Sequence, residues 1–186
     1  SNQKWLTEEE VKSDVEFNRN GLGFHKPGMW DKVIDIQNCY LQPEPSNSIR
    51  NFVKNYALEN QLAFFNLREQ EGLLRTLMIR TALSGEVMVL FQFFQDNSLE
   101  IEGLLSSLMD KFPKITSCQY VINPKGNDTI YDLNTIVFAG NDHIVEEMPS
   151  IFENTPPLRF KVGPKSFYQT NPKQAHTLYA KALEMA

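Results

Sequence analysis

The residues best suited to chemistry lie between Leu158 and Lys173, a window that contains several cations and no acid. Its cations are Arg159, Lys161, Lys165 and Lys173. Two aromatic residues, Phe167 and Tyr168, share the window, so the segment could contact a phosphate backbone and stack on a base. A solvated loop before a helix, with its rings in the core, explains the same residues, because lysine-rich loops are common on soluble proteins. Composition alone leaves both interpretations open.

The remaining chain offers no self-contained catalytic site. Its nine glycines form no glycine-rich strand-to-helix loop of the kind that holds a nucleotide or adenosylmethionine. The three histidines, His25, His143 and His176, lie far apart, and none has a Cys or Ser partner at a motif spacing. Carboxylates are plentiful but follow no pattern that names an acid/base pair. We therefore predict no catalytic residue in this chain.

Composition indicates a soluble globular chain. Of 186 residues, 41% are apolar and 22% are charged, which suits one ordinary domain with a short extension. The net charge of −5 argues against a complete RNA-binding protein, since such domains are usually basic. Neither a signal peptide nor an apolar run of membrane-spanning length is visible. The expected location is cytoplasmic, with Cys39 and Cys118 as free thiols.

Helical periodicity appears twice in the middle of the chain. The first apolar stripe follows a break at 42–46, with Ser46 or Ser48 as the predicted cap. The second runs from about Leu99 to Phe112, is capped by Asn97 or Ser98 and ends at Pro113. The two stripes consist of Ile49, Phe52, Val53, Tyr56 and Ala57, and of Ile101, Leu104, Leu105, Leu108, Met109 and Phe112.

Strand-forming runs surround these helices. Leu73–Leu83 and Glu86–Phe94, separated by Ser84-Gly85, predict a tight hairpin, and Ile115–Ile122 predicts another strand. Residues 135–139 and 143–148 predict a second hairpin around Gly140-Asn141. Short strands are expected at 21–28, 31–36 and 158–162, and Trp5–Val15 is expected to be a loop or a short helical turn.

A last helix is predicted after Asn171-Pro172, because Asn at the N-cap and Pro at the first helical position form a strong start signal. Its stripe would be Ala175, Leu178, Tyr179, Ala182 and Leu183. The chain ends inside this pattern at Met185-Ala186, as expected of a fragment. The predicted fold class is α+β, an antiparallel or mixed sheet packed with helices.

The window around residue 165 resembles a segment of the RNA (uracil-5-)-methyltransferase family, in particular of the bacterial enzymes that act on 23S ribosomal RNA or tRNA. The matching residues are Phe160, Pro164, Ser166, Phe167, Tyr168, Gln169, Thr170 and Asn171. Gly23–Gly28 with Val33–Cys39 resembles the family's stretch that ends in an iron–sulfur cysteine. Leu83–Leu90 is similar, more weakly, to the family's central hairpin.

The resemblance implies an enzyme that transfers a methyl group from S-adenosylmethionine to C5 of a uridine, after flipping the base out of a folded RNA. In that family a cysteine thiolate adds to C6 and a carboxylate removes the C5 proton. The parts for this chemistry would follow residue 186, so the chain itself should be inactive. RNA, ribosomal or transfer, is the implied partner, with no DNA or membrane.

Residue by residue, the resemblance assigns Gln169 to the cofactor, and Phe167 and Lys165 to the RNA substrate. Asn171 matches the Asn at the helix start, where capping alone is an alternative. Cys39 matches a ligand of the [4Fe-4S] cluster that many members carry. One thiolate cannot hold a four-iron cluster, so no cluster should assemble in this chain. Cys118, in a predicted strand, is interpreted as a core residue.

The resemblance also divides the chain. Residues 1–40 would be a lead-in close to the iron–sulfur segment, 41–162 the central α/β domain, and 163–186 a linker and the first helix of the catalytic domain. The alternative is a stand-alone RNA- or protein-interaction module without catalysis, for which a coherent basic face would be the mark.

Overall fold

The computed structural model describes residues 1–13, 17–152 and 154–185. Val15, which ends the predicted Trp5–Val15 segment, and Ala186 lie outside the described residues. The helices are α1 (Glu8–Lys12), α2 (Ser46–Glu59), α3 (Ser98–Lys111) and α4 (Pro172–Glu184). The strands are β1 (Gly23–His25), β2 (Val33–Asp35), β3 (Leu74–Thr81), β4 (Val87–Phe93), β5 (Ser117–Ile122), β6 (Ile136–Gly140), β7 (Ile144–Met148) and β8 (Leu158–Val162).

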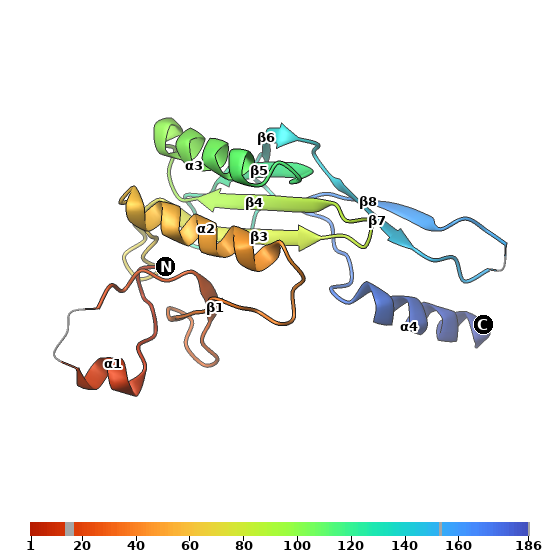
Figure 1. The fold of residues 1–186 in the computed structure, drawn as a ribbon, viewed down its shortest axis with the longest axis horizontal. Coiled ribbons are helices and arrows are strands. Elements are labelled where there is room, and N and C mark those ends of the chain that lie inside the picture. Colours follow the sequence, from red (N-terminus) through yellow and green to blue (C-terminus); the bar gives the residue numbers. More distant parts are fainter. Residues whose placement is uncertain (14–16, 153, 186) are drawn as a thin grey trace.

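A four-stranded mixed sheet in the order β3-β4-β5-β6 forms the centre of the molecule (Figure 1). The predicted hairpin is confirmed, since β3 and β4 pair antiparallel up to Thr81 and Val87. Gly85 lies in the turn with φ of 89°, a left-handed conformation that glycine adopts without a steric penalty. Strand β5 runs parallel to β4, with α3 as the crossover between them. The α+β class with a mixed sheet is therefore confirmed.

Helices α2 and α3 cover one face of this sheet (Figure 1). Both predicted stripes point into the core, and Ile49, Leu104, Leu105 and Leu108 are fully buried. The inner strands β4 and β5 supply the opposite half, including Val89, Phe93 and Cys118. Burial of this much apolar surface is the main stabilising term of the fold.

The helix caps agree with prediction for two helices and differ for the third. Asn97 accepts from the Glu100 amide at 3.5 Å at the start of α3. In α2 neither predicted serine caps the first turn; the Glu44 carboxylate accepts from the backbone N–H of Ser48 at 3.1 Å and from its hydroxyl at 2.8 Å. A glutamate side chain is long enough to reach a free amide one turn ahead, so it satisfies the group that a serine cap would have taken.

The predicted hairpin of residues 135–139 and 143–148 is wrong. Strand β6 pairs with β5, and β7 pairs with β8. At the junction, Gly140 has φ of 76° and the Asn141 amide donates to Thr116 O at 2.9 Å. This hydrogen bond ties the chain to the start of β5, so residues after Gly140 leave the central sheet instead of folding back on β6. The result is a separate β7–β8 ribbon, visible beyond the end of the sheet in Figure 1.

The described residues among the first forty lie below the sheet and α2 in Figure 1. Helix α1, within the expected helical turn, opens with a capping box in which Thr7 and Glu10 satisfy each other's amides. Strands β1 and β2 pair antiparallel, and Lys4 forms a parallel bridge to Val33. No helix in the ranges that the structure describes is long and apolar enough to cross a membrane.

Candidate functional site

The segment that follows β8 is a turn and then an extended stretch leading to α4; we call residues 163–171 the linker. The Ser166 amide donates to Gly163 O at 3.1 Å, and the Gly163 amide donates to Ser166 Oγ at 3.0 Å. These reciprocal bonds close a turn over Pro164 and Lys165. Proline suits the second position of such a turn, because its φ is already set.

Arg80, near the end of β3, holds this turn. Its Nη1 donates to Ser166 O at 2.8 Å and to Gly163 O at 3.3 Å. Burial lowers the pKa of the Arg80 guanidinium from its ordinary value, and the nearby Tyr131 partly opposes the shift. The guanidinium thus fixes the linker to the central sheet; we refer to these two hydrogen bonds as the Arg80 clasp. Sequence reasoning missed Arg80, because an arginine in an edge strand carries no local signal of a partner more than eighty positions away.

Lys165 points back to the protein. Its Nζ donates to Leu133 O at 2.6 Å and to Tyr131 O at 3.2 Å. An ammonium group has three donors, so two of them serve backbone carbonyls in this structure. The arrangement gives Lys165 a clear role in placing the turn, and its predicted contact with RNA stays a prediction.

The two aromatic residues of the linker face opposite ways. Phe167 is 85% exposed. Tyr168 is partly buried against Ala82, Met88, Ile144 and Val162. Its hydroxyl is buried without a hydrogen-bond partner among the described residues, and burial, together with the charge of Glu146, raises its pKa. Tyr168 therefore anchors the linker, while Phe167 is free to meet another molecule.

Gln169 is exposed, directly after this anchor. Two residues later Asn171 Oδ1 accepts from the Gln174 amide at 3.1 Å, which confirms Asn171 as the cap of α4. Within α4 only Ala175 of the predicted stripe is buried, and Leu178, Tyr179 and Leu183 are between 44 and 58% exposed. The helix projects from the body of the protein in Figure 1. The apolar periodicity therefore predicted the helix correctly, but the described residues do not bury its apolar stripe.

The window of residues 158–173 contains no acid, but strand β7, which pairs with β8, places acids next to it. Glu147 pairs with Arg159 across the ribbon, with Oε1 3.2 Å from Nε. Glu146 is buried opposite Phe160, where its carboxylate accepts from the Leu83 amide at 2.7 Å. The strand pairing thus neutralises part of the positive charge that the sequence window showed.

Cys39 lies in a loop that α2 holds. Its N–H donates to Asn47 Oδ1 at 2.7 Å, and its carbonyl accepts from Asn47 Nδ2 at 3.2 Å. Arg50 also donates to Asn47 Oδ1, at 2.7 Å, and to the carbonyl of Gln37 at 2.9 Å. The thiol is free and partly buried. Among the described residues no three His, Cys, Asp or Glu side chains gather so as to hold a metal ion. Cys39 by itself does not fit a four-iron cluster, which takes four ligands.

The two thiols should differ sharply in reactivity. Cys118 is fully buried in the core, and burial raises the pKa of its thiol to about 12. Because the thiolate is the nucleophile, Cys118 should be inert near pH 8. We expect one equivalent of Ellman's reagent to react with the native chain and a second only in denaturant. A Cys39→Ser variant is the control and should show no fast equivalent; rapid reaction of two native thiols would contradict the buried position of Cys118.

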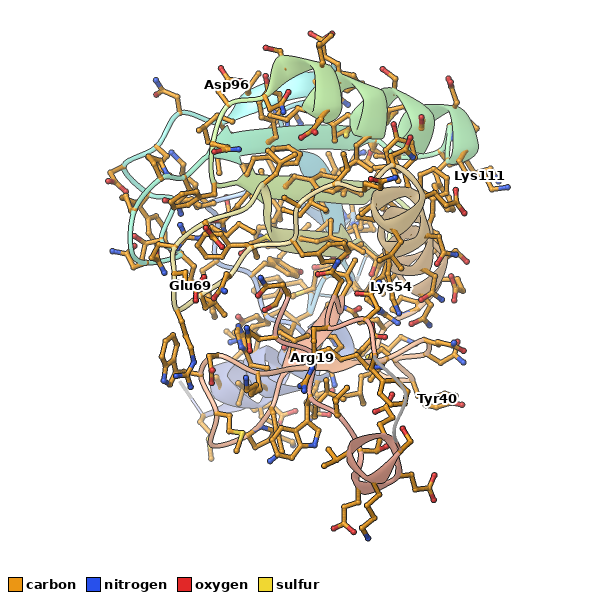
Figure 2. The ribbon with its side chains drawn as sticks, turned by 90° about the vertical axis from the view of Figure 1, so that its left-hand side faces the viewer. Arg19, Tyr40, Lys54, Glu69, Asp96 and Lys111 are labelled. Atoms are coloured by element: carbon orange, nitrogen blue, oxygen red, sulfur yellow. The ribbon has the colours of Figure 1, made fainter. Side chains whose placement is uncertain are left out.

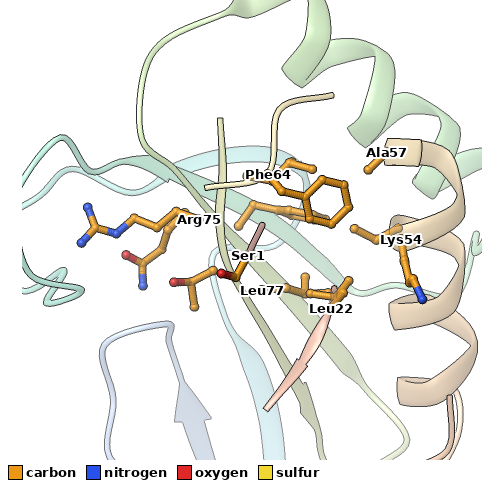
Figure 3. Close-up of a pocket in the computed structure, with 12 residues that line it drawn as sticks. Ser1, Leu22, Lys54, Ala57, Phe64, Arg75 and Leu77 are labelled. Carbon is orange, nitrogen blue, oxygen red and sulfur yellow. The ribbon is translucent and has the colours of Figure 1, made fainter. Parts of the chain in front are cut away.

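Two hollows lie away from the linker. Figure 3 shows the first, which Leu22, Lys54, Phe64 and Leu77 help to line. Its volume of about 30 Å³ suits a single water rather than a cofactor. The second is more open, measures about 620 Å³ and is lined by Asn and Gln side chains together with apolar residues such as Leu58, Leu62 and Phe64. Neither is lined by Gln169, Phe167, Lys165 or Cys39.

Comparison with known proteins points in one direction. No protein-family model matches the chain. An uncharacterized RNA methyltransferase of Bacteroides thetaiotaomicron is 51% identical over all of this chain, and one of Porphyromonas gingivalis is 48% identical. The chain spans 40% of the length of each of these relatives. Among solved structures, the Pyrococcus abyssi tRNA (uracil-54, C5)-methyltransferase in complex with S-adenosyl-L-homocysteine matches with a TM-score of 0.68 and 26% identity. That match covers 88% of this chain and 37% of the other.

Proposed function

Because the chain belongs to the RNA (uracil-5-)-methyltransferase family and spans about two fifths of its curated relatives, we propose that it is the non-catalytic central part of such an enzyme. The complete protein would transfer a methyl group from S-adenosylmethionine to C5 of a uridine in ribosomal or transfer RNA. The observation that carries this proposal is the match of most of the chain to a uracil-C5 methyltransferase. Acting on cellular RNA, the enzyme would be cytoplasmic.

The geometry of the linker supports a role at the edge of a binding site. Tyr168 and the Arg80 clasp hold the chain, and the neighbouring Phe167 and Gln169 are left exposed. A glutamine amide can accept from the ammonium of adenosylmethionine or donate to its carboxylate, and Phe167 can stack beside a flipped base. Adenosylmethionine would supply the methyl group; the residues of this chain would orient it.

Other parts of the site would come from outside these residues. We assign 1–40 to a lead-in, 41–162 to the central domain, and 163–186 to the linker with the first helix of a catalytic domain. A [4Fe-4S] cluster, if the complete enzyme has one, would draw on Cys39 and on ligands beyond this chain. The 186-residue chain alone should transfer no methyl group to RNA.

Replacing Gln169 with alanine in the complete enzyme should lower kcat/KM for RNA methylation about 10- to 100-fold. This range corresponds to a lost hydrogen bond to a charged group, about 1.5–3 kcal/mol. The assay would follow radiolabelled adenosylmethionine into RNA and identify 5-methyluridine by nucleoside chromatography.

The neighbouring exposed residue provides the matched control, since Thr170→Ala should change kcat/KM less than twofold. Equal rates for the wild type and the Gln169 variant would remove Gln169 from the cofactor site. Methylation by the 186-residue chain alone, or a methylated product other than 5-methyluridine, would contradict the proposed function itself.

A further inference from the structure

The strands of the lead-in build a small sheet with one unusual face. Lys4 lies opposite Val33, and Phe24 lies opposite Ile34. The pairing continues where the Lys26 amide donates to Lys32 O at 2.9 Å. Because side chains alternate along a strand and paired residues share a face, one face carries a set of residues that we call the lead-in face. It comprises Trp5, Phe24, Lys26, Lys32 and Ile34.

The two faces of this small sheet differ in burial. Val33 is 6% exposed and lies on the protein side. Asp35, two residues on, accepts from Lys54 of α2 and from the Leu22 amide, which ties that side to the body. On the lead-in face Phe24 is 48% exposed and Trp5 38% exposed. Large aromatic side chains are thus left on the solvent side of a sheet whose other side is fixed.

Cations accompany these rings. Lys26 Nζ lies 4.4 Å from the centroid of the Trp5 ring, a cation–π distance. Lys32 Nζ donates to Gln3 Oε1 at 2.6 Å and forms an ion pair with the carboxylate of the buried Asp31, 3.5 Å away. At the end of the same hairpin Arg68 lies 5.8 Å from the Trp30 ring.

The acids near this face are mostly paired. Asp31 binds Arg68, Asp35 binds Lys54, and Glu10 binds Lys4. Of the other acids close in sequence that the structure describes, Glu8 lies 3.7 Å from Lys12 Nζ, and Glu9 is exposed in the first turn of α1. In a chain with a net charge of −5, the lead-in face is therefore a local site where exposed aromatic rings and cations alternate.

We infer that the lead-in face binds single-stranded RNA, with unpaired bases stacked on Phe24 and Trp5 and with Lys26 and Lys32 beside the phosphates. The inference rests on the proposed function, which makes RNA the substrate, and adds a second contact to it, separate from the linker. Aromatic rings on a sheet surface stack on any base, and the adjacent cations supply charge complementarity to the backbone.

The test measures binding of a fluorescein-labelled 12-nucleotide oligouridylate to the 186-residue chain by anisotropy, and quenching of tryptophan fluorescence by the unlabelled RNA. Phe24→Ala should weaken binding at least about fivefold, as expected for loss of a stacked base. Lys26→Gln should weaken binding and reduce the slope of log affinity against log salt by about 0.7. Thermal unfolding would verify that both variants fold. Lys26→Gln, which removes a charge from a partly exposed side chain, keeps the test decisive if Phe24→Ala does not fold.

Matched controls lie at other ends of the molecule. Phe152 is 60% exposed, and Lys111 ends α3, away from the lead-in segment that carries Arg19 (Figure 2). Phe152→Ala and Lys111→Gln should leave the affinity unchanged. Wild-type affinity in the Phe24 and Lys26 variants, or absence of binding by the wild type at 100-fold excess of chain over probe, would overturn the inference.

The outcome is separable from that of the proposed function. Reduced RNA binding by Phe24→Ala and Lys26→Gln supports the lead-in face even if the complete enzyme makes no 5-methyluridine. Conversely, 5-methyluridine formation together with normal binding by these variants would overturn the lead-in face and leave the proposed function standing. Loss of binding in Phe167→Ala alone would place the RNA on the linker, which also overturns the inference.

Discussion

Gly140→Ala should lower the free energy of unfolding by about 3 kcal/mol, because two penalties coincide at one residue. Gly140 has φ of 76°, which costs an alanine roughly 1–2 kcal/mol. A Cβ atom there would also collide with the carbonyl oxygen of Thr116. That oxygen accepts from the Asn141 amide, so relieving the collision disturbs the junction where the chain leaves the sheet. Urea unfolding followed by circular dichroism would measure the change.

Substitutions at two other glycines distinguish the cost of the left-handed backbone from the cost of the collision. Gly85 has φ of 89° but open space around its Cβ position, so Gly85→Ala should cost only the backbone term of roughly 1–2 kcal/mol. Gly126 has open space and no left-handed φ, so Gly126→Ala should change stability by less than about 0.5 kcal/mol. Equal losses for Gly140→Ala and Gly85→Ala would show that the collision with Thr116 is relieved at no cost.

Removing the Arg80 clasp should have the second large effect. Arg80→Met keeps much of the side-chain volume but removes the donor of Ser166 O and leaves Gly163 O with the Ser166 amide alone, at an expected cost of about 1.5–3 kcal/mol. The turn should open more often, so the Ser166 amide, which donates to Gly163 O, should exchange with deuterium faster. Urea unfolding and hydrogen exchange would measure the two effects.

Charge and geometry can be separated at this position. Arg80→Lys retains the charge but lacks the planar fork of the guanidinium, so its loss of stability should fall between the wild type and Arg80→Met. Arg159→Met removes an exposed partner of Glu147 and should cost less than about 1 kcal/mol. Unchanged exchange at Ser166 in Arg80→Met would mean that Lys165 and Tyr168 suffice to hold the turn.

Local pattern predicted the central part of the fold. The apolar stripes of α2 and α3 lie in the hydrophobic core, and Ser84-Gly85 lies in the turn between β3 and β4. In these elements the sequence neighbours are also the structural partners, so periodicity and turn chemistry carry the information. Asn171-Pro172 likewise started α4, because a cap is a contact between residues three positions apart.

Pairing between distant residues was beyond such reasoning. Gly140-Asn141 resembles a hairpin turn, yet Asn141 bonds to Thr116 and sends the next strand to β8. The stripe of α4 indicated burial that the described residues do not provide. Amphipathic spacing reports that a helix can bury a face; it does not report which surface would cover it.

The candidate site divides in the same way. Gln169 and Phe167 came from resemblance, and both are exposed where an outside molecule can reach them. Lys165 was also predicted from the resemblance, but its ammonium group donates two hydrogen bonds to the carbonyls of Tyr131 and Leu133. Neither Arg80 nor Glu147 was predicted, because each reaches the window from another strand. The charges within a sequence window do not include those of residues that strand pairing brings next to it from elsewhere in the chain.

The Arg80 clasp also sets a limit on distance. Gln169 lies three residues beyond Ser166, whose carbonyl is held to β3. A chain extends at most about 3.6 Å per residue, so the Cα atom of Gln169 stays within about 11 Å of that of Ser166. The linker is thus a short tether: its length confines the amide to a small sphere at the end of the central sheet. Any surface that shares a ligand with Gln169 must come to that sphere, whatever path the rest of the polypeptide takes.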